Sequence, residues 1–215
     1  ASLEQMILAE GPETVAAFFA EPIMASGGMI VPPRTYFRKI QQVLRKYDVL
    51  FIVDEVICGF GRTGNMFGTQ TFDLQPDMIT MAEQLSSGYL PISALMVNEK
   101  IYRAMVDESR KIGTFGHGFT YSGHPVSAAV ALETLNIYEE DRILDHVRDI
   151  SLRFMQRLAT LGAHPLVGEA RGLGLIGAVE LVADKSTKAS FPPEAGVAVQ
   201  AGRHALAHGV ITRAL

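Results

Sequence analysis

The stretch Phe51-Ile-Val-Asp-Glu-Val-Ile-Cys-Gly-Phe-Gly-Arg-Thr-Gly-Asn65 decides the fold of this 215-residue chain. It continues a short apolar run over residues 49–53, which is typical of a parallel strand covered on both faces. Asp54 and Glu55 follow at the carboxyl end of that strand, where open α/β sheets place their ligands. The Asp54 carboxylate could hold a protonated ring nitrogen through a charge-assisted hydrogen bond, or it could simply cap the following turn.

A glycine-rich segment, Gly59-Phe-Gly-Arg-Thr-Gly64, follows the two acids. Glycine permits backbone angles and close approaches that other residues resist, so this segment is predicted to be a tight loop. Its letters match the dinucleotide-binding pattern G-x-G-x-x-G, but no second strand ending in an acid follows at the spacing that would hold a ribose. A generic nucleotide-binding α/β domain is therefore the less favoured interpretation.

Composition limits the classes of protein to which the chain can belong. Hydrophobic residues make up 48% of the chain and charged residues 20%, which is enough apolar surface for a globular core. The net charge is −4 and no basic tract stands out, which argues against nucleic acid or a membrane surface as a partner. Cys58 is the single cysteine, so no internal disulfide can form, and we expect a reducing, cytoplasmic location.

Hydrophobic periodicity predicts alternating strands and helices. A strand at 15–21, a helix at 34–47 and the strand at 49–53 would form a right-handed unit with parallel strands. We also expect helices at 2–10, 99–107, 125–161 and 195–208, strands at 78–81 and 93–97, and a turn followed by a strand within 167–181. The chain is therefore predicted to be α/β, with a large-domain sheet in residues 1–150 and the start of a small α+β domain in residues 151–215.

Several short motifs occur in a fixed order along the chain. They are Glu21-Pro22, Val53-Asp-Glu-Val56, Gly59-Phe-Gly-Arg-Thr-Gly64, Phe67-Gly68, Pro76-Asp77 and Phe119-Thr-Tyr-Ser-Gly-His-Pro125. Together they resemble the class III aminotransferases, which have the fold-type-I architecture of transferases that depend on pyridoxal 5′-phosphate (PLP). The segment Gln84-Leu-Ser-Ser87 is most similar to the ω-transaminases, so the resemblance implies PLP, small amine and keto acid substrates, and a homodimer or larger homo-oligomer.

The resemblance also assigns roles to four residues near the predicted strand ends. Asp54 would pair with the protonated pyridine nitrogen of PLP and keep the ring an electron sink. Glu21 would support the network around Asp54. Val56 would pack on one face of the ring, and Gln84 would also contact the cofactor. Taken alone, Val56 would be plain core, and only the ordered motifs favour a cofactor role.

The loop at 113–123 carries a second set of implied contacts. Phe119 and Thr120 would bind the cofactor phosphate in the neighbouring subunit's site, although an isolated threonine in a turn is usually structural. His117 and His124 lack partners at the spacing of zinc ligands, so no metal site is predicted.

Glu83 departs from the family pattern. It lies at the position of the lysine that forms the Schiff base with PLP and moves the proton during catalysis. Only an amine condenses with the aldehyde of PLP, although a carboxylate can still move a proton. We therefore expect this chain to bind PLP non-covalently at best and to be inactive as a transaminase.

Two hypotheses on function follow from the resemblance. In the first, the chain is part of a transaminase whose parent protein is catalytic. In the second, it is an inactive homologue that binds PLP or pyridoxamine phosphate without a covalent bond. The chain lacks an initiator methionine and has roughly half the usual length of the family, so we expect it to be a piece of a longer protein.

Overall fold

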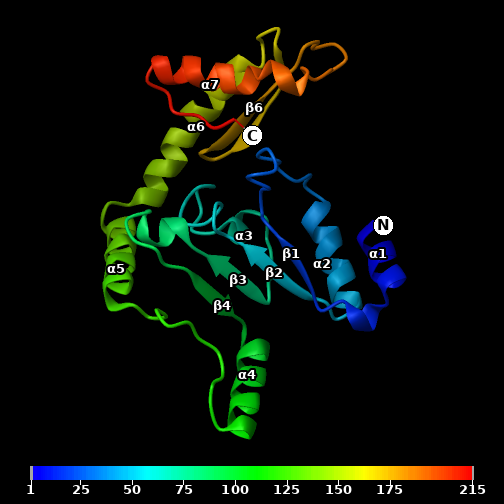
Figure 1. Cartoon of the computed structure of the whole chain (residues 1–215), viewed down its shortest axis with the longest axis vertical. Helices are drawn as coiled ribbons and strands as arrows, with labels where there is room; N and C mark the ends of the chain where they lie inside the picture. The colour runs from blue at the N-terminus through cyan, green and yellow to red at the C-terminus, as the bar shows by residue number, and fades with distance from the viewer. Residues whose placement is uncertain (1, 215) are drawn as a thin grey trace.

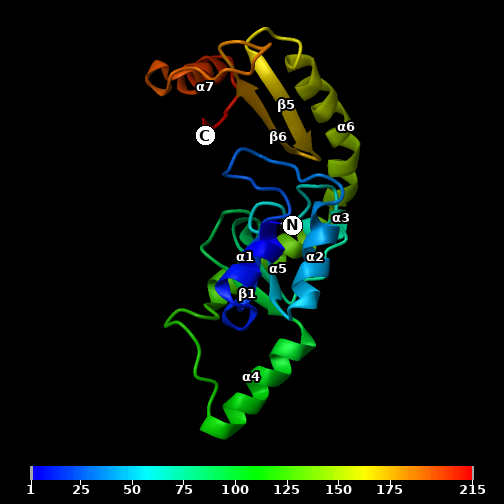
Figure 2. The ribbon, with the colours of Figure 1, turned by 90° about the vertical axis from the view of Figure 1, so that its right-hand side faces the viewer.

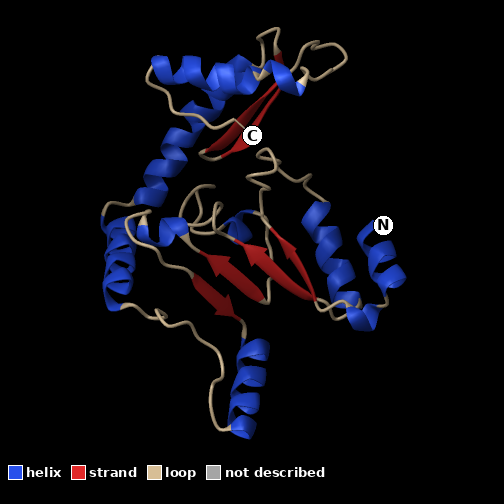
Figure 3. Cartoon of the chain, viewed as in Figure 1, coloured by secondary structure: helices blue, strands red, loops and turns tan. Residues whose placement is uncertain are grey.

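The computed structural model describes residues 2–214, which form two β-sheets with flanking helices (Figure 1). None of the described helices is both long and apolar enough to cross a membrane. Helices and strands alternate over residues 2–81, and Figure 3 shows both kinds of element in the chain. The elements are α1 (Ser2–Glu10), β1 (Ala17–Ala20), α2 (Tyr36–Lys46), β2 (Leu50–Asp54), α3 (Gly68–Thr71), β3 (Met78–Met81), β4 (Ala94–Val97), α4 (Glu99–Ile112), α5 (Pro125–Glu140), α6 (Ile143–Leu161), β5 (Val167–Leu173), β6 (Ile176–Leu181) and α7 (Val197–Ala207).

The larger sheet has the strand order β1-β2-β3-β4. The first three strands are parallel, and β4 runs antiparallel to β3. In the register, Phe18 lies opposite Phe51 and Asp54 lies opposite Thr80. The predicted α/β class with a mainly parallel sheet is thereby confirmed.

Helices α1 and α2 cover one face of this sheet, and Figure 2 shows the two lying side by side. Because strand side chains alternate between faces, Phe51 and Val53 point into this layer together. There they meet Ile7 of α1 and Phe37 of α2, and all four side chains are almost fully buried. This is the main hydrophobic core of the chain.

The opposite face of the sheet is less covered than the sequence predicts. Ile52 and Asp54 of β2 are only half-buried. Phe19 and Leu95 point to the same face, according to the register, and are 55% and 57% exposed. The sequence predicted that β2 would be covered on both faces. Within residues 2–214, helices cover only one face of it.

The predicted long helix over 125–161 is divided into α5 and α6. The helix breaks at Asp141 and Arg142, and Arg142 takes a left-handed φ of 50°. Glu139, Glu140 and Asp141 lie at the end of α5, where the helix dipole disfavours negative charge, so the local charges do not account for a helix end here. This break separates two helices and does not test the domain boundary predicted near residue 150. That boundary stays a prediction.

Residues 167–181 form two strands, whereas the sequence predicted a turn and one strand. β5 and β6 pair antiparallel as a hairpin, with Gly174 and Leu175 between them. Phe154 and Leu158 of α6 pack against this hairpin and lie within 3.2 Å of the place where Gly177 would carry a Cβ atom. Glycine on both strands lets α6 approach the hairpin closely. Because glycine has no side chain, the strands lack the alternation of apolar and polar residues from which a strand is predicted.

Three hydrogen bonds to backbone oxygens tie the hairpin and α6 to the sheet part. The Leu175 N–H donates to Arg62 O over 2.9 Å. The Nε of Arg148 donates to Gly64 O over 2.8 Å, and the Nε of Arg171 donates to Gly28 O over 2.9 Å. The hairpin is consequently held above the carboxyl ends of the strands, as Figures 1 and 2 show.

The substitution Gly174→Ala should separate the hairpin from the glycine-rich loop. Gly174 has a left-handed φ of +61°, and a Cβ there would lie 2.4 Å from Arg62 O and 2.8 Å from Thr63 Cα. Backbone strain and this clash together should lower the free energy of unfolding by about 3 kcal/mol. Urea unfolding measures the loss.

The matched control is Gly196→Ala. Gly196 has a similar φ of +56°, but no atom lies within 4 Å of its added Cβ. This variant should lose only the cost of the left-handed backbone, about 1 kcal/mol. Equal losses for the two variants would contradict the docking of the hairpin on the loop.

Candidate functional site

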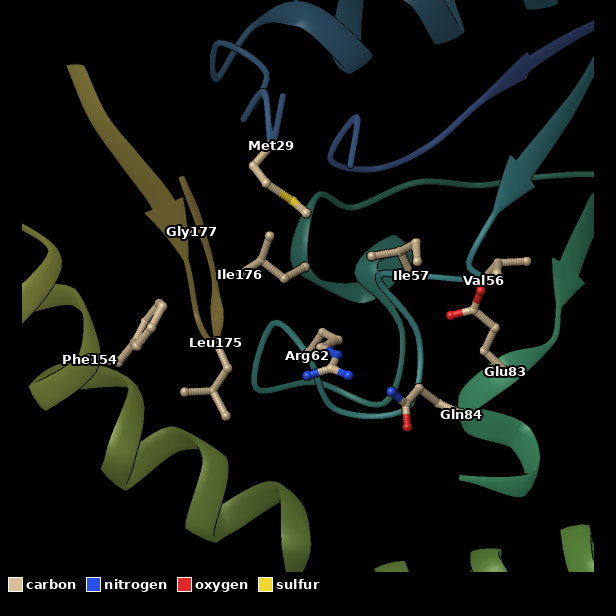
Figure 4. A pocket seen from close by; sticks show the side chains of 10 residues that line it. All are labelled: Met29, Val56, Ile57, Arg62, Glu83, Gln84, Phe154, Leu175, Ile176 and Gly177. Atoms are coloured by element: carbon tan, nitrogen blue, oxygen red, sulfur yellow. The ribbon is translucent and has the colours of Figure 1, made fainter. Parts of the chain in front are cut away.

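A cavity of about 270 Å³ lies between the large sheet and the β5–β6 hairpin (Figure 4). Its walls are mostly apolar, with a few polar side chains, which is the usual make-up of a small-molecule site. Met29, Val56, Ile57, Arg62, Glu83 and Gln84 line it from the sheet side, and Phe154, Leu175, Ile176 and Gly177 line it from the hairpin side.

Asp54 lies at the carboxyl end of β2, beside this cavity but not among its lining residues. Its Oδ1 accepts a hydrogen bond from the Val56 N–H over 3.0 Å, so the expected turn cap is present. Its Oδ2 has no hydrogen-bond partner within residues 2–214. Asp54 therefore orients Val56, which does line the cavity, and keeps one carboxylate oxygen available.

Glu55 is fully buried and closes the loop that forms one wall of the cavity. Its two carboxylate oxygens accept hydrogen bonds from the Gly68 N–H over 2.8 Å and the Thr69 N–H over 2.6 Å. Burial raises the pKa of the Glu55 carboxyl above its ordinary value, although these hydrogen bonds act in the opposite direction. The role of Glu55 is structural, since both of its oxygens are occupied by backbone donors.

Glu83 opens the short 3₁₀ turn that follows β3, and its backbone has a left-handed φ of 45°. Figure 4 shows its carboxylate pointing toward Val56 at the cavity wall. This carboxylate makes no hydrogen bond or ion pair with the residues that the structure describes. A non-glycine residue in this conformation carries strain, which is common at functional sites.

The basic side chain that lines the cavity is Arg62, and among residues 2–214 no lysine lines it. Lys46 and Lys100 lie elsewhere, in surface ion pairs with Glu4 and Asp48. The cavity thus holds one carboxylate and one guanidinium, with no amine that could condense with an aldehyde.

The structure does not bring all the predicted site residues to this cavity. Glu21 follows β1, next to the end of β2, and its Oε2 accepts a hydrogen bond from the Ala25 N–H over 2.9 Å. Phe119 and Thr120 lie on the exposed loop between α4 and α5, and Phe119 is 77% exposed. Only Val56, Glu83 and Gln84 of the predicted set line the cavity itself.

Sequence reasoning missed several of the lining residues. Arg62 was within reach of the sequence, because it lies inside the quoted glycine-rich loop. Phe154 and Ile176 carry no local signal, because each reaches the cavity only through the docking of α6 and the hairpin.

Cys58 takes no part in the cavity. It is fully buried, and burial raises the pKa of its thiol to about 12. The thiol therefore stays protonated at neutral pH and is not a nucleophile.

Several known proteins that are similar to this chain in sequence are named as transaminases. A model of the family described as "Aminotransferase class-III" matches residues 1–215. The gamma aminobutyrate transaminase 3, chloroplastic, of Solanum lycopersicum is 52% identical over 212 residues, which is 99% of this chain and 41% of that protein. The vanillin aminotransferase of Capsicum chinense is 51% identical over 210 residues, which is 98% of this chain and 46% of that protein. The chain thus spans less than half the length of these relatives.

Solved structures show the same fold at similar identity. A transaminase with L-alanine has a TM-score of 0.96 and 56% identity, and the match covers 99% of this chain and 50% of the transaminase chain. The omega transaminase from Pseudomonas jessenii in complex with PMP has a TM-score of 0.95 and 54% identity, and covers 99% of this chain and 47% of its own. The mixed sheet with its hairpin and flanking helices is therefore part of a larger, recurrent architecture.

Stability should depend on pH through Glu55. Because its folded pKa is raised above the unfolded value, the folded state binds this proton more tightly. The contribution of Glu55 to stability is present below the unfolded pKa and is lost as the pH rises through the folded pKa. As the pH rises above about 4, the free energy of unfolding should therefore fall relative to that of the Glu55→Gln variant.

Glu4→Gln provides a control of opposite sign for these urea titrations. The hydrogen bond from Lys46 lowers the pKa of Glu4, so the contribution of Glu4 is present above the unfolded pKa and is lost as the pH falls. The native protein should thus gain stability over Glu4→Gln with rising pH. If the stability difference from the native protein changed with pH in the same direction for both variants, burial would not control the pKa of Glu55.

Proposed function

Because the chain belongs to the class III aminotransferases, we propose that its parent protein is built to transfer an amino group between a small amine or amino acid and a keto acid such as pyruvate. The support is the set of relatives, which are named for γ-aminobutyrate and vanillin, together with the omega transaminases of similar structure. The activity is assigned to the whole parent, since the chain spans less than half the length of those relatives.

The family uses PLP, which when bound supplies an aldehyde that takes up the amino group and a ring that withdraws electrons. We propose that the free oxygen of Asp54 binds the protonated ring nitrogen and that Val56 lies on one face of the ring. Gln84 lines the same cavity and would contact the cofactor beside Val56. Glu21 would support Asp54 by fixing the turn after the neighbouring strand.

One observation carries the proposal for this particular chain: a carboxylate, Glu83, lines the cavity where covalent attachment of PLP needs an amine. The donor set therefore does not fit an aldehyde held by a covalent bond. A carboxylate can accept a proton but cannot condense. As the sequence stands, we propose that the site holds its cofactor non-covalently and does not transaminate.

We also propose that the active unit is a homodimer or a larger homo-oligomer. Helix α4 and the loop after it project from the body of the chain, as Figures 1 and 2 show. Phe119 and Tyr121 on this loop are 77% and 81% exposed. Phe119 and Thr120 would then reach the cofactor phosphate in the site of the neighbouring subunit.

A cytoplasmic location remains our proposal on the ground of the single, reduced cysteine. Two tomato relatives are named as chloroplastic and mitochondrial, so location differs within the family.

In the full-length protein, Glu83→Lys should restore transamination between an amine and pyruvate. The protein with Glu83 should be at least about 10³-fold slower, because proton transfer and cofactor attachment both lack their amine. The measurement is the rate of alanine formation from pyruvate at saturating amine and PLP.

Glu10→Lys makes the same change of charge on the exposed end of α1 and should restore nothing. If the unchanged protein is as active as Glu83→Lys, the role given to position 83 is wrong. If Glu83→Lys gains no activity, the inactive homologue is the correct alternative.

A further inference from the structure

Glu83 brings an unpaired negative charge to a cavity with mainly apolar walls. Its side chain faces Val56, and Ile57 and Ile176 lie further along the same cavity (Figure 4). Arg62 and Gln84 also line the cavity, but the Glu83 carboxylate makes no hydrogen bond or ion pair with them or with any other residue within 2–214. A ligand that brings a cation to this point would gain a charge-assisted hydrogen bond.

We propose that Glu83 makes this cavity selective for the amino form of the cofactor, pyridoxamine 5′-phosphate (PMP), over the aldehyde form, PLP. This inference rests on the proposed function, because it requires a cofactor site of the family's kind. The two forms differ at one carbon, which carries an ammonium group in PMP and an aldehyde in PLP. The ammonium donates hydrogen bonds to a carboxylate, whereas the aldehyde oxygen can only accept them.

The charges around the cavity match PMP better than PLP. Asp54 and Glu83 each have at least one carboxylate oxygen without a hydrogen bond at this end of the sheet. Both oxygens of Glu55, in contrast, accept hydrogen bonds from backbone N–H groups. PMP offers two cations, the pyridinium and the ammonium, whereas PLP offers only the pyridinium. Arg62 lines the same cavity but makes no ion pair with either carboxylate within the described residues, so it leaves the Glu83 oxygens open to a ligand.

The backbone at position 83 is held in an ordered turn. Glu83 has a left-handed φ of 45°, and its carbonyl oxygen accepts a hydrogen bond of 3.0 Å from the Gly88 N–H. Glutamine and lysine would carry the same backbone strain as glutamate, because each has an unbranched Cβ. Differences in ligand binding between variants at position 83 therefore reflect the chemistry of the side chain and not a change in the backbone.

The test is an equilibrium titration of the full-length protein with PMP and, separately, with PLP at neutral pH, followed by cofactor fluorescence. With Glu83, PMP should bind about tenfold more tightly than PLP. Glu83→Gln should bring the ratio of the two dissociation constants to about one, mainly by weakening PMP. Glu10→Gln removes the same charge far from the cavity and should leave the tenfold ratio unchanged.

The inference is overturned if the protein with Glu83 binds PLP as tightly as PMP, or if Glu83→Gln keeps the preference. Glu83→Lys separates this failure from a failure of the proposed function, because borohydride should fix PLP to that lysine and raise the protein mass. If PLP is fixed and the protein with Glu83 shows no preference, only the inference on Glu83 fails. If no PLP is fixed and neither form binds, both fail.

Discussion

The buried carboxylate of Glu55 is the contact on which the site depends. Removing a carboxylate from water is costly, and two charge-assisted hydrogen bonds from Gly68 and Thr69 offset part of that cost. These bonds join the residue after β2 to the start of α3, thirteen and fourteen positions later. The intervening loop is thereby closed, and it carries Val56 and Arg62 to the cavity.

The closed loop in turn supports the second sheet. Arg62 O and Gly64 O accept hydrogen bonds from the hairpin and from α6. The cavity wall formed by the hairpin and α6 is therefore held in place by the glycine-rich loop, which forms the opposite wall. The cavity therefore exists only while both parts are docked. We propose that Glu83 sets its chemistry, since a carboxylate can bind a cation but cannot condense with an aldehyde.

The sequence by itself determined the sheet and the strand-end acids. The apolar run before Asp54 and the run at 78–81 are local patterns, and both became parallel strands within one residue of their predicted bounds. The family resemblance, rather than any local pattern, implied that Asp54, Val56 and Glu83 belong to one site. The order of the motifs was sufficient to indicate the family, which the family match over residues 1–215 confirmed.

Tertiary structure alone decided the break at Arg142, the hairpin and the far wall of the cavity. Gly174 reads as one glycine among several, and its role follows from contact with Arg62, more than a hundred positions away. Ile176 lines the cavity for the same reason. Local sequence encodes the hydrophobic period and turn chemistry of a segment, whereas the side of a segment that meets another depends on packing between residues far apart in the chain.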